Sequence, residues 1–206
     1  MSDGPSLAAS AAVLQVFAFV WGTVWGSFLN VVIYRLPAGG SLVHPPSTCG
    51  RCGTRIAWYD NVPVLSYLLL RGRCRACGVA YGPRYALVEL LCGVLCLALL
   101  RAAVLPLTDV EALVHALWMW LWLQAFVYLL VAITFIDLDH LWIPDELSFL
   151  GLLVGLAGAF FLPVVQPTDH VFGAFGAAAF MLAIAGLGRL IFGREALGLG
   201  DAKLLT

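Results

Sequence analysis

Residues 135–145 read FIDLDHLWIPD and place three carboxylates between two long apolar segments. Ionisable side chains at a membrane boundary are functional candidates, although many simply lie in headgroup water. Asp137 directly follows the apolar run, so a charge at this position is the most expensive of the three. The segment therefore separates two predicted membrane helices and contains the first candidate for a functional residue.

The composition is that of a polytopic membrane protein. The 206 residues are 62% hydrophobic and 11% charged, whereas a soluble domain carries about 25% charged residues. The net charge of −1 provides no overall field that would attract nucleic acid. The N-terminus lacks the basic region of a cleaved signal peptide, so we interpret the first apolar run as a membrane helix.

Five apolar runs are near or above the roughly 20 residues that a bilayer-spanning helix needs. They cover residues 7–34, 86–105, 113–136, 147–165 and 171–192, and a sixth is expected to begin after Lys203. Between the first two runs lies a polar insert, residues 35–85, rich in Arg, Gly, Pro and Cys. The predicted fold is all-α, with five to six transmembrane helices and a small folded insert.

The positions of Lys and Arg predict the orientation, because cytoplasmic loops carry an excess of them. Ten basic residues lie around the insert or the last loop: Arg35, Arg51, Arg55, Arg71, Arg73, Arg75, Arg84, Arg189, Arg194 and Lys203. Only Arg101 falls on the other side. We therefore expect the insert to be cytoplasmic and the N-terminus to be outside, and the same threading places Asp137 and Asp201 at the cytoplasmic face.

The insert contains two C-x-x-C pairs, Cys49/Cys52 and Cys74/Cys77, with 21 residues between them. Four thiolates with this spacing suit a tetrahedral Zn²⁺. The glycine after each pair permits the tight turn that brings both sulfurs to one ion. The alternatives are disulfides, which a cytoplasmic location disfavours, and reduced structural cysteines. A closed four-cysteine site has no open coordination position, so we predict structural zinc.

The other two cysteines, Cys92 and Cys96, lie one helical turn apart inside the second apolar run. We predict that they are small packing residues rather than metal ligands.

A second candidate carboxylate, Asp201, lies in GLGDAK, residues 198–203, where Gly198 and Gly200 would allow close backbone approach. Two carboxylates in a poorly solvated cleft share a proton. One can then deprotonate a bound water while the other protonates the leaving amine, which is peptide hydrolysis without a covalent intermediate. G-x-G-D alone is a weak motif, because glycine-rich helix junctions are common for packing reasons.

The remaining polar residues of the first cluster have simpler interpretations. Asp145 follows Pro144 and precedes an apolar run, which predicts a helix N-terminus whose amides it caps. Asp139 and His140 lie deeper in the predicted loop, where solvation is sufficient to explain them. An interfacial histidine is usually neither a metal ligand nor a proton relay.

Taken together, these residues resemble the type IV prepilin peptidases, a family of bacterial inner-membrane aspartic proteases. The resemblance rests on GSFLNVVIYRLP (residues 26–37), NVPVLSY (61–67) between the cysteine pairs, RYALVE (84–89), Asp137, and Asp201 within Gly-x-Gly-Asp-x-Lys. Any one motif is modest, but their common order along the chain is highly specific.

The resemblance implies cleavage of the leader peptide of prepilins or pseudopilins at the cytoplasmic membrane face, with Asp137 and Asp201 as the catalytic pair and Gly198, Gly200 and Lys203 in support. It also implies, for many members, N-methylation with S-adenosylmethionine, to which no residue here is assigned. Residues 1–34 would then form the first membrane helix, 35–85 the zinc insert and 86–206 the catalytic domain. Family members usually continue beyond the second aspartate, whereas this chain ends five residues later, so we expect a truncated domain of weak activity.

Two alternatives belong to other functional classes. A non-catalytic, zinc-bearing assembly protein of a pilus or secretion system would bind metal but be indifferent to loss of either aspartate. A proton-coupled transporter subunit would place its carboxylates near the bilayer midplane and contain inverted repeats. Here the carboxylates lie at one face and no internal repeat is visible.

Overall fold

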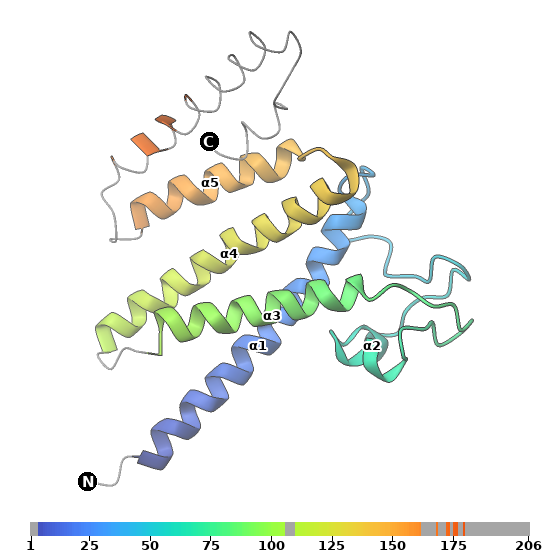
Figure 1. Ribbon diagram of the computed structural model, residues 1–206, viewed down its shortest axis with the longest axis horizontal. Coiled ribbons are helices and arrows are strands. Elements are labelled where there is room, and N and C mark those ends of the chain that lie inside the picture. Colours follow the sequence, from blue (N-terminus) through green and yellow to red (C-terminus); the bar gives the residue numbers. More distant parts are fainter. Residues whose placement is uncertain are drawn as a thin grey trace. The chain divides into compact units, whose positions relative to one another are not determined.

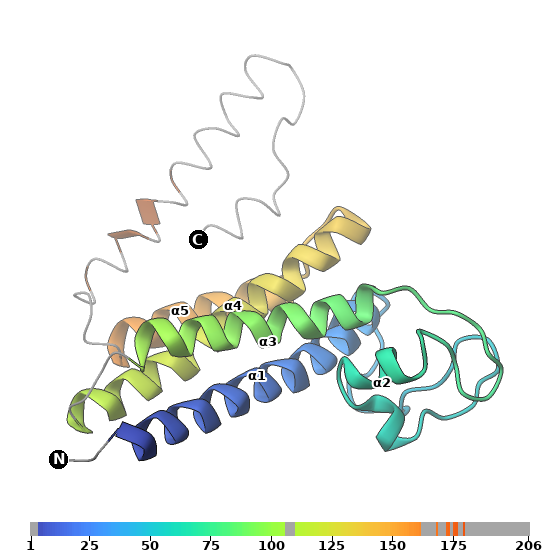
Figure 2. The same cartoon turned by 60° about the horizontal axis from the view of Figure 1, so that its bottom comes forward.

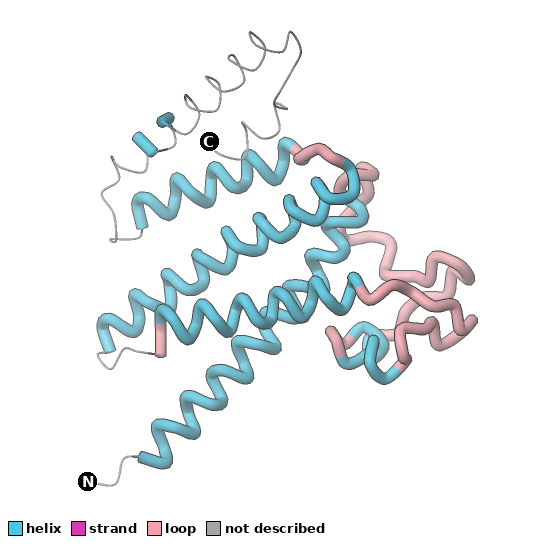
Figure 3. The backbone as a smooth tube through the Cα atoms, in the orientation of Figure 1, coloured by secondary structure: helices cyan, strands magenta, loops and turns pink. Residues whose placement is uncertain are grey.

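The computed structural model describes residues 4–105 and 110–161, with six isolated positions beyond them. The elements are α1 (Gly4–Arg35), the 3₁₀ helix η1 (Trp58–Asn61), α2 (Leu65–Leu69), α3 (Arg84–Ala103), α4 (Val110–His140) and α5 (Asp145–Phe161) (Figure 1). Among the described residues there is no β-strand, only two isolated bridges within the insert (Figure 3). The all-α prediction is confirmed.

Three described helices are long and apolar enough to cross a membrane: Ser10–Arg35, Arg84–Ala103 and Glu111–His140. They confirm the first three predicted spans. The last continues four residues past the predicted end at 136, because the backbone remains helical through the first polar residues. The fourth predicted span begins as α5, of which 17 residues are described. Most of the fifth lies outside the described residues.

The chain divides into two compact units, residues 1–132 and 133–206, with the boundary inside α4. The first contains α1, the insert, α3 and most of α4. The second contains the last turns of α4 and all of α5.

Within the first unit, α1 and α3 lie close together (Figures 1 and 2), and glycines of α1 make the contact. A Cβ added to Gly22 of α1 would lie 2.6 Å from the carbonyl oxygen of Cys92, and one added to Gly26 would lie 2.6 Å from the Cα of Glu89. Both contacts are to backbone atoms of α3, so no side chain can move aside. Small residues at such positions let membrane helices pack closely.

Larger side chains extend the core from α3 to α4. The indole N–H of Trp120, on α4, donates to the carbonyl oxygen of Cys96 on α3 at 3.1 Å. Leu100 and Ala116 are buried around this bond. Cys92 and Cys96 are themselves fully buried and form no disulfide, which fits the predicted packing role.

The α1–α3 contact can be tested with alanine. Gly22→Ala should lower the free energy of unfolding by about 1–3 kcal/mol, because the new methyl group meets backbone that cannot yield. The matched control is Gly151→Ala in α5, where no atom of the described residues beyond the helix's own neighbouring backbone lies within 4 Å of an added Cβ; it should be neutral or stabilise by up to about 1 kcal/mol. Denaturant titration in detergent measures both, and equal stability of the two variants would contradict the proposed close approach.

A candidate metal centre and a candidate catalytic aspartate

The two C-x-x-C segments form the same hairpin twice. The Gly53 amide donates to the Cys49 carbonyl at 2.9 Å, and the Gly78 amide donates to the Cys74 carbonyl at 2.9 Å. Gly53 and Gly78 have φ values of +70° and +69°, a conformation that glycine adopts without steric cost. We call these two hairpins the knuckles. Their common geometry explains why glycine follows each second cysteine.

The knuckles bring all four predicted ligands together. The sulfurs of Cys49, Cys52, Cys74 and Cys77 lie within 4.8 Å of one another, close enough to hold a metal ion. The Sγ atoms of Cys49 and Cys77 are 3.8 Å apart. Tetrahedral Zn–S bonds of about 2.3 Å require sulfur separations of about 3.8 Å. The donor set therefore fits Zn²⁺ in type, number and spacing.

The thiols of the cluster differ in acidity. Hydrogen bonds from the hydroxyl and amide of Thr54 lower the pKa of Cys52 to about 6, because both stabilise its thiolate. The Val79 amide favours the thiolate of Cys77 in the same way. Desolvation and the neighbouring sulfurs outweigh that bond and raise the pKa of Cys77 to about 11. A bound cation would favour the thiolate form of the clustered sulfurs.

An ion pair joins the second knuckle to η1. The Arg75 guanidinium donates to both carboxylate oxygens of Asp60, with distances of 2.6–3.0 Å, and lies 5.6 Å from the centre of the Tyr59 ring. The hydrogen bonds from Arg75 hold the pKa of Asp60 below its usual value. This bidentate ion pair links the segment between the cysteine pairs to the second knuckle.

The insert is fastened to the membrane helices by Glu89 of α3. The Val64 amide donates to its Oε2 at 2.7 Å, and the Ser27 hydroxyl of α1 also bonds to the carboxylate. Val64 has φ +61°, and the Leu65 amide donates to the Pro63 carbonyl at 2.6 Å. This γ-turn is strained for a β-branched residue and persists because its surroundings impose it. Sequence reasoning missed the contact, although a lone carboxylate inside an apolar run was a visible signal.

The first predicted catalytic residue, Asp137, lies in the last turn of α4. It is half-buried and follows the fully buried Ile136, whereas Asp139 and His140 are exposed. A helix C-terminus carries partial negative charge, so a carboxylate here does not stabilise the helix. This placement is consistent with a functional role for Asp137.

The helix ends at His140, three residues after Asp137, in an unusual conformation. Leu141 has φ +54°, and its amide donates to the Asp137 carbonyl at 2.8 Å. A left-handed residue commonly ends a helix, but that residue is usually glycine. The backbone is therefore strained one helical turn after the candidate aspartate.

Asp145 lies where the sequence predicts. It begins α5, and both Asp145 and Glu146 lie in the first turn, where negative charge is favourable. The second predicted catalytic residue, Asp201, lies outside the described residues, as do Gly198, Gly200 and Lys203.

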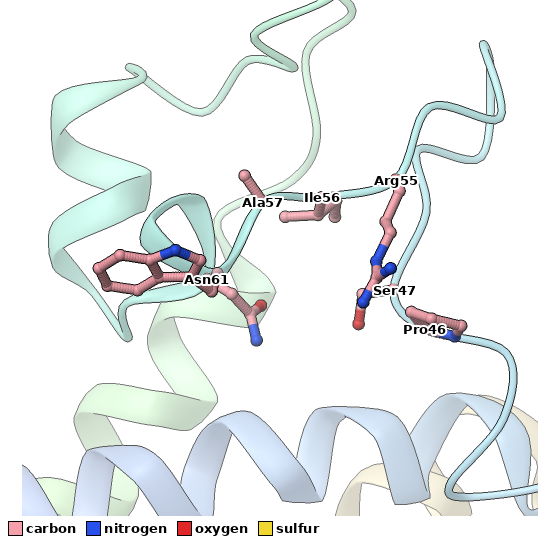
Figure 4. A pocket seen from close by; sticks show the side chains of 7 residues that line it. Pro46, Ser47, Arg55, Ile56, Ala57 and Asn61 are labelled. Carbon is pink, nitrogen blue, oxygen red and sulfur yellow. The ribbon is translucent and has the colours of Figure 1, made fainter.

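The insert also contains an open cavity of about 460 Å³ (Figure 4). Pro46, Ser47 and Arg55 form one wall and Asn61 lies opposite, with Ile56 and Ala57 between them. Its lining contains one cation and no carboxylate.

Two family models match this chain. The bacterial peptidase A24 N-terminal domain matches residues 20–103, and the type IV leader peptidase family matches residues 124–206. The first match covers the second half of α1, the insert and α3. The second includes Asp137 and Asp201. No solved structure matches the chain.

Several curated relatives share the name prepilin leader peptidase/N-methyltransferase. The protein of Myxococcus xanthus is 45% identical over 94% of this chain, which spans 55% of that relative's length. The Klebsiella pneumoniae protein is 38% identical over 92% of this chain and 81% of its own length. The Dichelobacter nodosus protein is 34% identical, with 92% and 72% covered.

The strained end of α4 generates a prediction. Leu141→Gly should raise the free energy of unfolding by about 1 kcal/mol, because glycine removes the cost of the left-handed conformation. Leu138→Gly is the matched control, since Leu138 is also exposed but lies within the helix, and it should destabilise by about 1 kcal/mol. Denaturant titration in detergent distinguishes them. A Leu141→Gly variant no more stable than the parent would show that the turn stores no such strain.

Proposed function

Because this chain belongs to the type IV leader peptidase family, we propose that it cleaves the leader peptide of prepilins or pseudopilins in the bacterial inner membrane. The observation that carries the proposal is Asp137, half-buried at the end of an apolar helix, within the part of the chain that matches the family model. The family match disfavours the two alternatives, an assembly protein and a transporter subunit.

The connectivity supports a common membrane face for the insert and Asp137. The insert joins the end of α1 to the start of α3, and α3 and α4 each cross the membrane once in this proposal. The chain therefore returns to the insert side at Asp137. The arginines of the insert favour the cytoplasm, where a reduced metal-binding cluster is also stable.

The proposed chemistry needs two carboxylates. Asp137 and Asp201 would share one proton and bind a water between them. The ionised carboxylate takes a proton from the water as it attacks the scissile carbonyl carbon, and the protonated one donates to the leaving nitrogen. Gly198, Gly200 and Lys203 flank Asp201 in the motif, and the glycines would let the substrate backbone approach closely.

We also propose that Cys49, Cys52, Cys74 and Cys77 hold a structural Zn²⁺. The sulfur separations fit the ion, and four protein ligands leave no coordination position for substrate. The metal would therefore stabilise the insert rather than participate in hydrolysis.

The relatives' name also implies methyl transfer, for which S-adenosylmethionine is the expected methyl donor. The cavity of the insert does not fit it: a ribose is commonly recognised by a carboxylate, and the lining offers none. We therefore assign neither this cavity nor any other described residue to a methyl-transfer step.

Metal removal provides one test. Protein purified without chelator should contain one Zn²⁺, and chelation should unfold the insert, because metal binding supplies its folding free energy. Elemental analysis and proteolysis between residues 35 and 85 measure the two effects. Replacing the four cysteines by serine should abolish metal content, while Cys92→Ser and Cys96→Ser serve as controls that retain it. A metal-free parent protein would contradict the proposed site.

The two-aspartate mechanism provides another test. Asp137→Asn and Asp201→Asn should each reduce leader cleavage by at least about 100-fold, because general acid–base catalysis contributes that much or more. The double variant should be hardly worse, since the two residues act as a unit. Asp139→Asn is the matched control and should retain activity.

Cleavage is measured by incubating each membrane-purified variant with a prepilin and determining the new N-terminus by mass spectrometry. Zinc content and membrane insertion should be unchanged, because asparagine is nearly isosteric with aspartate. Full cleavage by either Asp137→Asn or Asp201→Asn would refute the mechanism, and loss with Asp139→Asn alone would relocate the site.

A further inference from the structure

The short helix α2 exposes three leucines. Leu65, Leu68 and Leu69 are 58%, 64% and 82% exposed. They form the outer face of the helix, because its other residues turn inward. Such a concentrated apolar surface on a helix marks an interaction site.

The inner face of α2 is held by the insert. Ser66 is buried and its hydroxyl donates to the Tyr59 carbonyl at 3.2 Å. The ring of Tyr67 packs edge-on against Tyr81, with 5.7 Å between centroids. These contacts fix the rotation of α2, so the three leucines point away from the insert.

The contact with Glu89 fixes the depth of α2. Val64, which directly precedes the helix, is bonded to a residue five positions past the start of the membrane-spanning helix Arg84–Ala103. At 1.5 Å per residue this is about 7.5 Å along the helix axis. Both views show α2 beside the beginning of α3 (Figures 1 and 2). The outer face therefore lies beside the first turns of the membrane-spanning helix, the end at which a headgroup region is expected.

The residues that flank α2 suit the same boundary. Trp58 and Tyr59 precede it and are exposed, and these two residue types are enriched at membrane interfaces. Arg71 and Arg73 follow it and are also exposed. The only carboxylate among residues 35–85 is Asp60, and it is paired with Arg75. The charge of this region therefore favours anionic lipid.

We propose that α2 is an interfacial anchor. Leu65, Leu68 and Leu69 insert into the leaflet next to the insert, and Arg71 and Arg73 bind anionic lipid phosphates. Five residues offer far less than the roughly 800 Å² per partner of a stable protein interface, and the helix lies where lipid already surrounds α3. The anchor holds the insert against the membrane surface, whether or not the protein is a peptidase.

Photo-cross-linking tests this placement. The photoreactive amino acid p-benzoylphenylalanine replaces Leu69 in the whole protein, reconstituted in nanodiscs of phosphatidylethanolamine and phosphatidylglycerol. Irradiation should give adducts of lipid mass by intact-protein mass spectrometry. The matched control carries the same group at Arg51, an exposed position of the first knuckle, and should give several-fold fewer. A parallel replacement of Leu68 should behave like that of Leu69, and provides the test if the first variant does not fold.

Phosphatidylglycerol should be over-represented among the adducts at Leu69, and Arg71→Gln with Arg73→Gln should abolish that excess. Equal lipid yields at Leu69 and Arg51 would overturn the anchor. So would adducts formed mainly with a second copy of the chain or with an added prepilin. An excess of phosphatidylglycerol that survives both arginine substitutions would overturn the phosphate contacts.

Discussion

The rest of the first unit depends on the close approach of α1 and α3. Lipid tails are as apolar as leucine, so no hydrophobic force drives two helices together in a membrane, and packing must do so. Gly22 and Gly26 meet that requirement by letting α1 reach the backbone of α3. The same approach brings the Asn30 amide to within 2.9 Å of the Tyr85 carbonyl. This contact holds the end of α1 and the start of α3 at a fixed separation, and the insert has to connect these two helix ends.

Two kinds of contact hold the insert in place, one local in the sequence and one between distant residues. The knuckles are local, because each needs only a glycine turn and two cysteines three residues apart. The bond between Val64 and Glu89 is non-local and joins the insert to a membrane helix. A carboxylate inside an apolar helix needs hydrogen-bond donors, and the Val64 amide and Ser27 hydroxyl supply them. Glu89 is therefore explained as a structural residue that maintains a strained turn.

The difference between local and non-local contacts also explains how much of the fold and of the candidate site could be predicted from the sequence. Apolar length predicted the first three spans, and cysteine spacing predicted a cluster that the structure brings together. The Val64–Glu89 bond was not predictable, because it depends on how α1 and α3 pack. The left-handed backbone conformation of Leu141 was equally unpredictable from the sequence, because residues other than glycine rarely adopt it. The pairing of Asp137 with Asp201 remains a prediction, because Asp201 lies outside the described residues.

The carboxylates near the predicted membrane boundaries can be distinguished by what each does for the fold. Glu89 accepts hydrogen bonds from two other segments. Asp145 and Glu146 occupy the first turn of α5, where the helix dipole favours negative charge. Asp137 is half-buried in the last turn of α4, where the helix dipole opposes a negative charge, and the strained Leu141 follows four residues later. Within the part of the chain that the structure describes, a structural role accounts for the first three but not for Asp137. The proposed catalytic role of Asp137 is consistent with this placement.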